Sequence, residues 1–139
     1  MERVLLPTPE QTRLEALHNY KILDTDPEEV FDDLIRLASY ICGSPIAMIS
    51  LVDEERQWFK ACKGIDLSET ARSDSFCAHA IKHHDVMIVP DALEDERFAH
   101  LPFVTGEARI RFYAGAPLID PHGNALGTIC VMDSRPHSL

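Results

Sequence analysis

The segment PIAMISLVD, residues 45–53, constrains the fold of this chain more than any other. Its side chains are apolar on both alternating faces, so a β-strand here needs a covering layer on each side. Just before it, in residues 26–43, apolar residues recur at helical spacing. Pro27 suits the first turn of such a helix and Gly43 its end. We therefore expect a central strand with this helix laid on one of its faces.

Four further segments predict the rest of a sheet. RQWFKACKG, residues 56–64, follows a polar turn and predicts a hairpin with the central strand. VMIVP, residues 86–90, predicts a short strand. RIRFYAGAPLID and ALGTICVMD predict two strands joined by the turn sequence PHGN. Tight turns of this kind favour an antiparallel sheet with helices on its faces, which is the α+β class.

Two more helices are expected outside these segments. Thr8 and Pro9 predict the start of a helix that runs to about Tyr20. Its apolar face is thin, so we expect it to lean on the domain or on a second copy of itself. A shorter helix is expected at residues 95–99.

The chain is acidic, and its charge argues against some classes of partner. Its 139 residues fit one domain, with 1–24 as an N-terminal helix and connector and 25–139 as the folded unit. The formal net charge of −10 repels phosphate backbones and anionic lipid. We therefore expect neither a nucleic-acid nor a membrane partner. Four widely spaced cysteines, without a C-x-x-C pair, indicate reduced thiols in a cytoplasmic protein.

SFCAHAIKHH, residues 75–84, is expected to form a helix, and it concentrates one cysteine and three histidines. In a helix His79 and His83 share a face, a spacing that metal sites use, but no third ligand joins them. Cys77 lies on the apolar face with Phe76, where a thiol is a poor nucleophile. We expect neither a metal site nor a catalytic residue here, and we interpret Cys77 as lining the wall of a cavity.

Several polar residues remain open to two interpretations. Arg111 and Tyr113 alternate with apolar neighbours, which predicts that they share one face of the sheet. Asp91 follows a strand end and is expected either to pair with an arginine or to contact a ligand. An arginine beside a tyrosine on a covered sheet face suits an anionic or polar ligand.

Together these segments resemble a GAF domain. The resemblance is carried by YKILDTDPEEVFDDLIRLAS, PIAMISLVDEERQWFKACKGI, ETARSDSFCAHAI, VPDALEDERF, IRFYAGAPL and GNALGTICVMD. More narrowly they are similar to the bacterial branch found N-terminal to diguanylate cyclase, phosphodiesterase, PAS or histidine kinase modules. The resemblance implies a central antiparallel sheet of five or six strands. It also implies dimer-forming helices on one face and a ligand pocket on the other.

Carried over position by position, the resemblance nominates seven residues of the pocket or its lid. It identifies neither the ligand nor a cofactor. The cyclic-nucleotide signature N-K-x-F-D-E is missing, and VPDALED is a poor match to the bilin-binding motif. The free methionine-R-sulfoxide reductases carry a catalytic cysteine in a segment that corresponds to FVTGEARIRF here. This stretch has no cysteine, which argues against reductase activity. The seven residues are Phe76, Cys77, His79, Asp91, Phe98, Arg111 and Tyr113.

The sequence therefore predicts a non-catalytic regulatory domain of bacterial signal transduction that senses a small molecule or the redox state. It would act as a homodimer through its helices and regulate an attached or partner domain. A cavity is expected between residues 75–84 and the strand that contains Tyr113. The alternative is a dimerisation module without a ligand, and the third possibility is a thiol-based methionine sulfoxide reductase.

Overall fold

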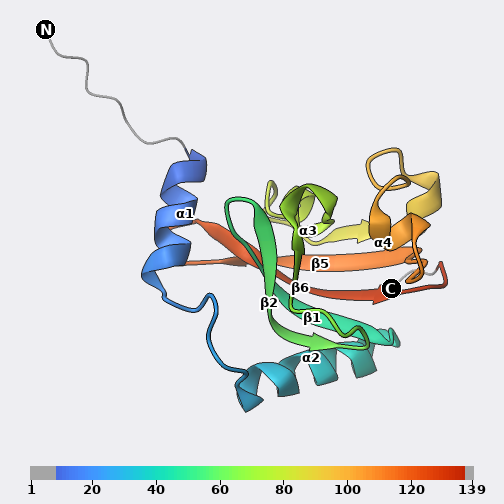
Figure 1. Cartoon of the computed structure of the whole chain (residues 1–139), viewed down its shortest axis with the longest axis horizontal. Coiled ribbons are helices and arrows are strands. Elements are labelled where there is room, and N and C mark those ends of the chain that lie inside the picture. The colour runs from blue at the N-terminus through green and yellow to red at the C-terminus, as the bar shows by residue number, and fades with distance from the viewer. Residues whose placement is uncertain (1–8, 137–139) are drawn as a thin grey trace, which may run out of the picture.

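The computed structural model describes residues 9–136, which form one antiparallel sheet with helices on both faces (Figure 1). The strand order is β3-β2-β1-β6-β5-β4, and every neighbouring pair is antiparallel. This confirms the predicted α+β class and a sheet of six strands within the described residues. The strands are β1 (Ile46–Val52), β2 (Arg56–Lys63), β3 (Glu69–Ala71), β4 (Met87–Val89), β5 (Phe112–Ile119) and β6 (Ala125–Asp133).

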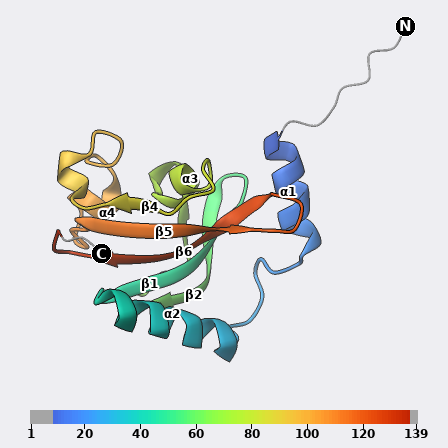
Figure 2. The same cartoon turned by 180° about the vertical axis from the view of Figure 1, so that it is seen from behind.

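Strand β1 lies at the centre of the sheet, as its two apolar faces predict, and all seven of its residues are buried. Helix α2 (Glu29–Cys42) covers one face, where Ile35 packs with Ala47 and Ile49. The helix ends at Gly43, whose φ of 62° is left-handed. Figure 2 shows α2 on one side of the sheet and α3 and α4 on the other.

The second face is covered by short elements instead of a long helix. They are the 3₁₀ turns at Arg72–Asp74 and Ala92–Glu94, helix α3 (Cys77–Ala80) and helix α4 (Pro102–Thr105). Helix α3 is far shorter than the expected helix over 75–84. The polar run of residues 82–85 offers no apolar side chain to hold another turn against the sheet, and all four residues are exposed.

The helix expected at residues 95–99 is wrong. That stretch forms a turn in which the Asp95 carboxylate accepts hydrogen bonds from the backbone and side chain of Arg97. Aspartate favours such local bonds over helix interiors, because its side chain competes with the helical backbone pairing.

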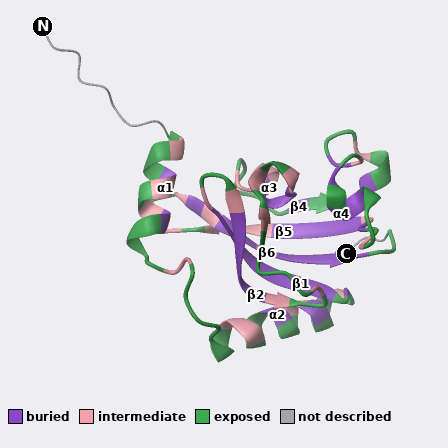
Figure 3. Cartoon of the chain, in the orientation of Figure 1, coloured by how far each residue is buried: buried purple, intermediate pink, exposed green. Residues whose placement is uncertain are grey.

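Helix α1 (Pro9–Asn19) confirms the predicted N-terminal helix and lies across one end of the sheet (Figures 1 and 2). The proposed cap Thr8 lies outside the described residues. Leu17 is fully buried and packs with Leu51 and Trp58. Figure 3 shows the central strands largely buried and the outer surfaces of α1 and α2 exposed. None of the helices in residues 9–136 has the length and apolar character needed to cross a bilayer.

Leu17→Ala should lower the free energy of unfolding by about 2–5 kcal/mol, because it removes a fully buried side chain and leaves a cavity. Leu93→Ala, at an exposed position in the 3₁₀ turn Ala92–Glu94, should change it by less than about 0.5 kcal/mol. Urea unfolding of both variants measures the difference. Equal effects would show that α1 does not pack on the domain in solution.

Candidate functional site

A row of polar side chains crosses the sheet beneath α3, in a layer that is otherwise apolar. The Sγ atom of Cys77 lies 3.1 Å from the Thr128 Oγ1 atom and 3.4 Å from the Tyr113 hydroxyl. Further along, Ser50 donates a hydrogen bond of 2.9 Å to the Gln57 Oε1 atom. These five side chains come from α3 and four strands, and all are buried. They satisfy one another, which is how a folded chain keeps buried polar groups without a large cost.

The outer end of the row reaches β3 at the edge of the sheet. The Gln57 Nε2 atom donates to the Thr70 Oγ1 atom at 2.7 Å. Strand pairing sets this order, because Ser50 is opposite Thr128 and Gln57 is opposite Thr70. Five neighbouring strands thus contribute one polar side chain each, from Tyr113 on β5 to Thr70 on β3.

Tyr113 reaches Cys77 because residue 115 is a glycine. A Cβ atom at Gly115 would lie 2.1 Å from the Tyr113 hydroxyl and 2.6 Å from the ring carbon that carries it. The tyrosine ring therefore lies along the strand, over the place where another residue would carry a side chain.

Hydrogen bonding alters the titration of the buried thiols. A hydrogen bond from Cys130, followed by bonds from Thr128 and Tyr113, lowers the pKa of Cys77, although burial acts in the opposite direction. The pKa of Cys130 is raised by its bond to Cys77 and by burial. Burial raises the pKa of Tyr113. The polar groups close to the Cys77 thiol are thus hydroxyls and a second thiol. Because Cys77 is buried, its thiol would also need access from solvent to act as a nucleophile.

Aromatic rings form a roof over this row. The Phe76 ring stacks on Tyr113 at 4.7 Å between centroids, with an angle of 10° between the planes. Phe98 lies 4.7 Å from Phe76, and His79 meets Phe98 edge-on at 5.0 Å. Burial lowers the pKa of His79. Side chains therefore fill the space between α3 and Tyr113 where the sequence predicts a cavity.

The structure brings together five of the seven nominated residues and leaves Asp91 and Arg111 outside the cluster. Asp91 accepts a hydrogen bond of 3.1 Å from the Leu93 amide and caps a 3₁₀ turn. Within residues 9–136 no ion pair joins Asp91 to an arginine, and Arg97 pairs with Asp95 at 2.8 Å instead. Arg111 lies just before β5, and its backbone amide still donates 2.9 Å to the Asp133 carbonyl of β6. Its guanidinium donates 2.9 Å to the Val104 carbonyl.

The part of the chain that the structure describes holds no group of three or more histidine, cysteine or carboxylate side chains placed to bind a metal ion. His79 contacts Phe98, and His83 is exposed.

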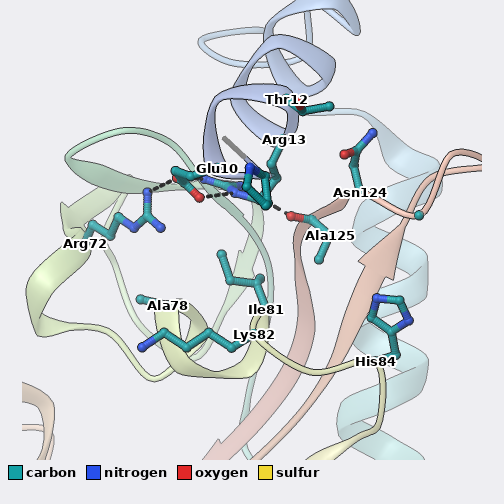
Figure 4. Close-up of a pocket in the computed structure, with 12 residues that line it drawn as sticks. Glu10, Thr12, Arg13, Arg72, Ala78, Ile81, Lys82, His84, Asn124 and Ala125 are labelled. Carbon is teal, nitrogen blue, oxygen red and sulfur yellow. Dashed lines mark hydrogen bonds and ion pairs between the residues drawn. The ribbon is translucent and has the colours of Figure 1, made fainter. Parts of the chain in front are cut away.

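An open cleft of about 630 Å³ lies beside the cluster, between α1, α3 and the β5–β6 turn (Figure 4). Its basic side chains Arg13, Arg72 and Lys82 are absent from the seven nominated residues. Their separation in the sequence explains the omission, since only the docking of α1 brings residue 13 close to residue 72.

The comparisons with known proteins agree with this architecture. The sequence model of the GAF domain matches residues 26–139. The chain belongs to the GAF family. The resemblance noted in the sequence is thereby confirmed, and GAF neighbours share its fold.

A relative with close sequence similarity to this GAF domain is a cyclic di-GMP phosphodiesterase of Pseudomonas aeruginosa. It is 45% identical over 130 residues, which are 94% of this chain and 22% of that protein. The chain thus spans about a fifth of the length of the curated relative that it matches. The comparison establishes a GAF domain with a relative in a signalling protein.

Solved structures with low sequence identity share the fold. The GAF domain of a phosphoenolpyruvate-protein phosphotransferase from Coxiella burnetii superposes with a TM-score of 0.64 at 13% identity, covering 92% of this chain and 79% of that one. The free methionine-R-sulfoxide reductase of Neisseria meningitidis, solved with its substrate, also reaches 0.64. It is 12% identical and covers 100% of this chain and 83% of that one. The same fold thus occurs in a domain of a phosphotransferase and in a reductase.

Gly115→Ala should destabilise the domain by about 1–3 kcal/mol, because the new methyl group would collide with the Tyr113 ring. In a Tyr113→Ala background the same change should cost much less. Chemical unfolding of the two single variants and the double variant gives the coupling between them. If the losses of stability in the two single variants simply add in the double variant, Gly115 does not serve to make room for the Tyr113 ring.

Proposed function

We propose that this GAF domain is a regulatory sensor that binds a small molecule beneath α3. The observation that carries the proposal is the row of buried polar side chains from Tyr113 to Gln57, which is covered by a short roof. Hydroxyl, amide and thiol groups at such a place suit the orientation of a ligand, since most pockets combine apolar walls with a few placed polar groups. In the closed state the same groups bind one another instead.

We expect the roof, which consists of α3 and the aromatic rings beside it, to move more easily than α2 on the opposite face. Helix α3 has four residues, whereas α2 has fourteen. Displacing the Phe76 ring from Tyr113 would uncover the Cys77 and Thr128 side chains for a ligand. A ligand that prefers the open roof by about 1–3 kcal/mol changes the output by about 5- to 150-fold.

Displacement of the roof would also expose the buried thiols, and we therefore include redox sensing in the proposal. Cys77 and Cys130 are free and buried, and reactivity of a thiol requires both thiolate character and access to solvent. The hydrogen bonds around Cys77 supply the first condition and an open roof would supply the second. Free thiols also fit a cytoplasmic location, which belongs to the proposal.

The regulated activity is proposed to reside outside the domain. The relative at 45% identity is named as a cyclic di-GMP phosphodiesterase, and this chain matches 22% of its length. We therefore favour a signalling output concerned with cyclic di-GMP, in an attached or partner domain. A reductase activity of the GAF domain itself has weaker support, because the similarity to the reductases is one of fold and Cys77 is buried.

A ligand should raise the melting temperature in a thermal-shift screen of nucleotides, cyclic di-GMP, amino acids and methionine sulfoxide. For a compound that does so, Tyr113→Phe and Thr128→Val should each weaken binding by about 2- to 12-fold, the value of one hydrogen bond. Tyr40→Phe is the matched control, since Tyr40 is exposed on α2. If no compound stabilises the domain, or if the control behaves like the two variants, the sensor function is wrong.

The second candidate function, dimerisation, is favoured by the outer face of α2. Exposed apolar side chains there follow spacings of four, three and four residues, which is the pattern of a helix-pairing seam. We propose a homodimer through this surface. The residues of the seam are Val30, Leu34, Leu37 and Ile41.

Leu34→Glu combined with Ile41→Glu should convert the dimer to a monomer, because it places charges in the apolar seam. Arg36→Glu, an exposed change on the same helix outside the seam, should leave the mass unchanged. Size-exclusion chromatography with light scattering measures the mass of each. A monomeric wild type, or a dimer that survives both glutamates, would refute pairing through α2.

A further inference from the structure

The cleft between α1, α3 and the β5–β6 turn gathers positive charge in an acidic chain. Arg13, Arg72 and Lys82 line it, while Glu10 is the carboxylate among its described lining residues. The chain as a whole carries a formal charge of −10. A local excess of cations against that background concentrates anions at this place. Arg72 and Lys82 also line an adjoining hollow, together with the acidic Glu54 and Glu55.

One carboxylate holds both arginines. Glu10 accepts hydrogen bonds of 2.8 and 3.0 Å from Arg13 and one of 2.6 Å from Arg72 (Figure 4). Hydrogen bonds from Arg13 and then Arg72 lower the pKa of Glu10 to about 2, although partial burial acts the other way. The carboxylate is therefore ionised at neutral pH. Two guanidinium groups converging on one set of anionic oxygens is the arrangement that also binds phosphate.

The arginines are held in place apart from this carboxylate. The Arg13 side chain is 7% exposed, and it also donates to the Ala125 carbonyl at 3.4 Å. Arg72 donates to the Asp53 carbonyl at 3.1 Å. These backbone contacts would keep both guanidinium groups near the cleft if Glu10 moved away. Glu10 is more exposed, at 42% of its side chain, and lies in the first turn of α1.

The rest of the cleft has room for an organic group. Its volume of about 630 Å³ lies in the range of small-molecule sites, about 300–1,000 Å³. The walls combine apolar side chains with the Asn124 amide and the Thr12 hydroxyl. Figure 4 shows Ala78, Ile81 and Lys82 on the wall opposite α1. A bare ion would leave most of this space empty.

We propose that this cleft binds a phosphorylated small molecule, whose phosphate takes the place of the Glu10 carboxylate between Arg13 and Arg72, with Lys82 as a third cation. The site is separate from the polar row beneath α3 and does not depend on a ligand there. Glu10 acts as a tethered competitor, because its carboxylate occupies the anion position in the empty state. The ligand would contact both α1 and the segment that follows α3, so its binding would alter the docking of α1.

The test measures binding of pyrophosphate, AMP and adenosine to the full chain by isothermal titration calorimetry at low salt. Pyrophosphate and AMP should bind, adenosine should not, and the affinity should fall as salt is raised. Glu10→Gln removes the competing charge and should tighten AMP binding by about tenfold. Lys82→Gln and Arg72→Gln, each made in the Glu10→Gln background, should weaken it by about tenfold, the value of one charge-assisted hydrogen bond.

Arg36→Gln is the matched control, since Arg36 is exposed on α2 and pairs with Asp33. It should leave the affinity for AMP unchanged in the same background. Lys82 is exposed, so its substitution tests the site without disturbing the fold, and circular dichroism verifies the folding of every variant. If AMP fails to bind Glu10→Gln, or if Lys82→Gln and Arg36→Gln bind it equally well, the cleft is not a phosphate site. Glu10 would then be only a structural link between α1 and the domain.

Discussion

The structure depends on the burial of β1 on both faces. A strand whose side chains are apolar on either side must lie between two covering layers, and the two layers here differ in kind. On one face α2 packs as a single continuous helix that ends at Gly43. On the other face short helices, 3₁₀ turns and loops share the covering. This asymmetry gives the domain a rigid side and a side made of small pieces. The candidate sites lie on or beside the second, where small local movements change what is covered.

Polar side chains within the covered layer link its packing to function. Cys77, Tyr113 and Thr128 lie under the Phe76 ring, and Gly115 leaves room for the tyrosine to reach them. Their hydrogen bonds are made with one another, so the closed state keeps few unmet groups. Opening of the roof would break these hydrogen bonds unless another molecule replaced them. In the proposed sensor, a ligand that replaces them would offset the cost of displacing the roof.

Charged side chains attach α1 to this domain, and several of the scarce basic residues are used there. Arg72 binds Glu10, and His18 contacts Asp53 at 2.8 Å. Arg56 binds Asp24 in the connector at 2.7 Å. Leu17 supplies the apolar part of the contact. Because partly exposed ion pairs are individually weak, α1 is held by a small apolar contact and a set of adjustable charges. An anion that competes for those charges would therefore alter the position of α1.

The sequence by itself determined the α+β class, the central place of β1, the helices α1 and α2, and the hairpin of β5 and β6, because each follows from a periodicity or a turn within one short segment. It also placed Phe76, Cys77 and Tyr113 near one another through the family pattern. It misjudged the length of α3, because residues 82–85 have no apolar side chain to hold another turn on the sheet. It also misjudged the turn at Asp95, where local side-chain bonds outweigh periodicity. Only the tertiary structure decided that rings fill the space under α3 and that Arg13 meets Arg72 through Glu10. Contacts between residues 36 or 62 positions apart depend on strand order and helix docking, which no local spacing encodes.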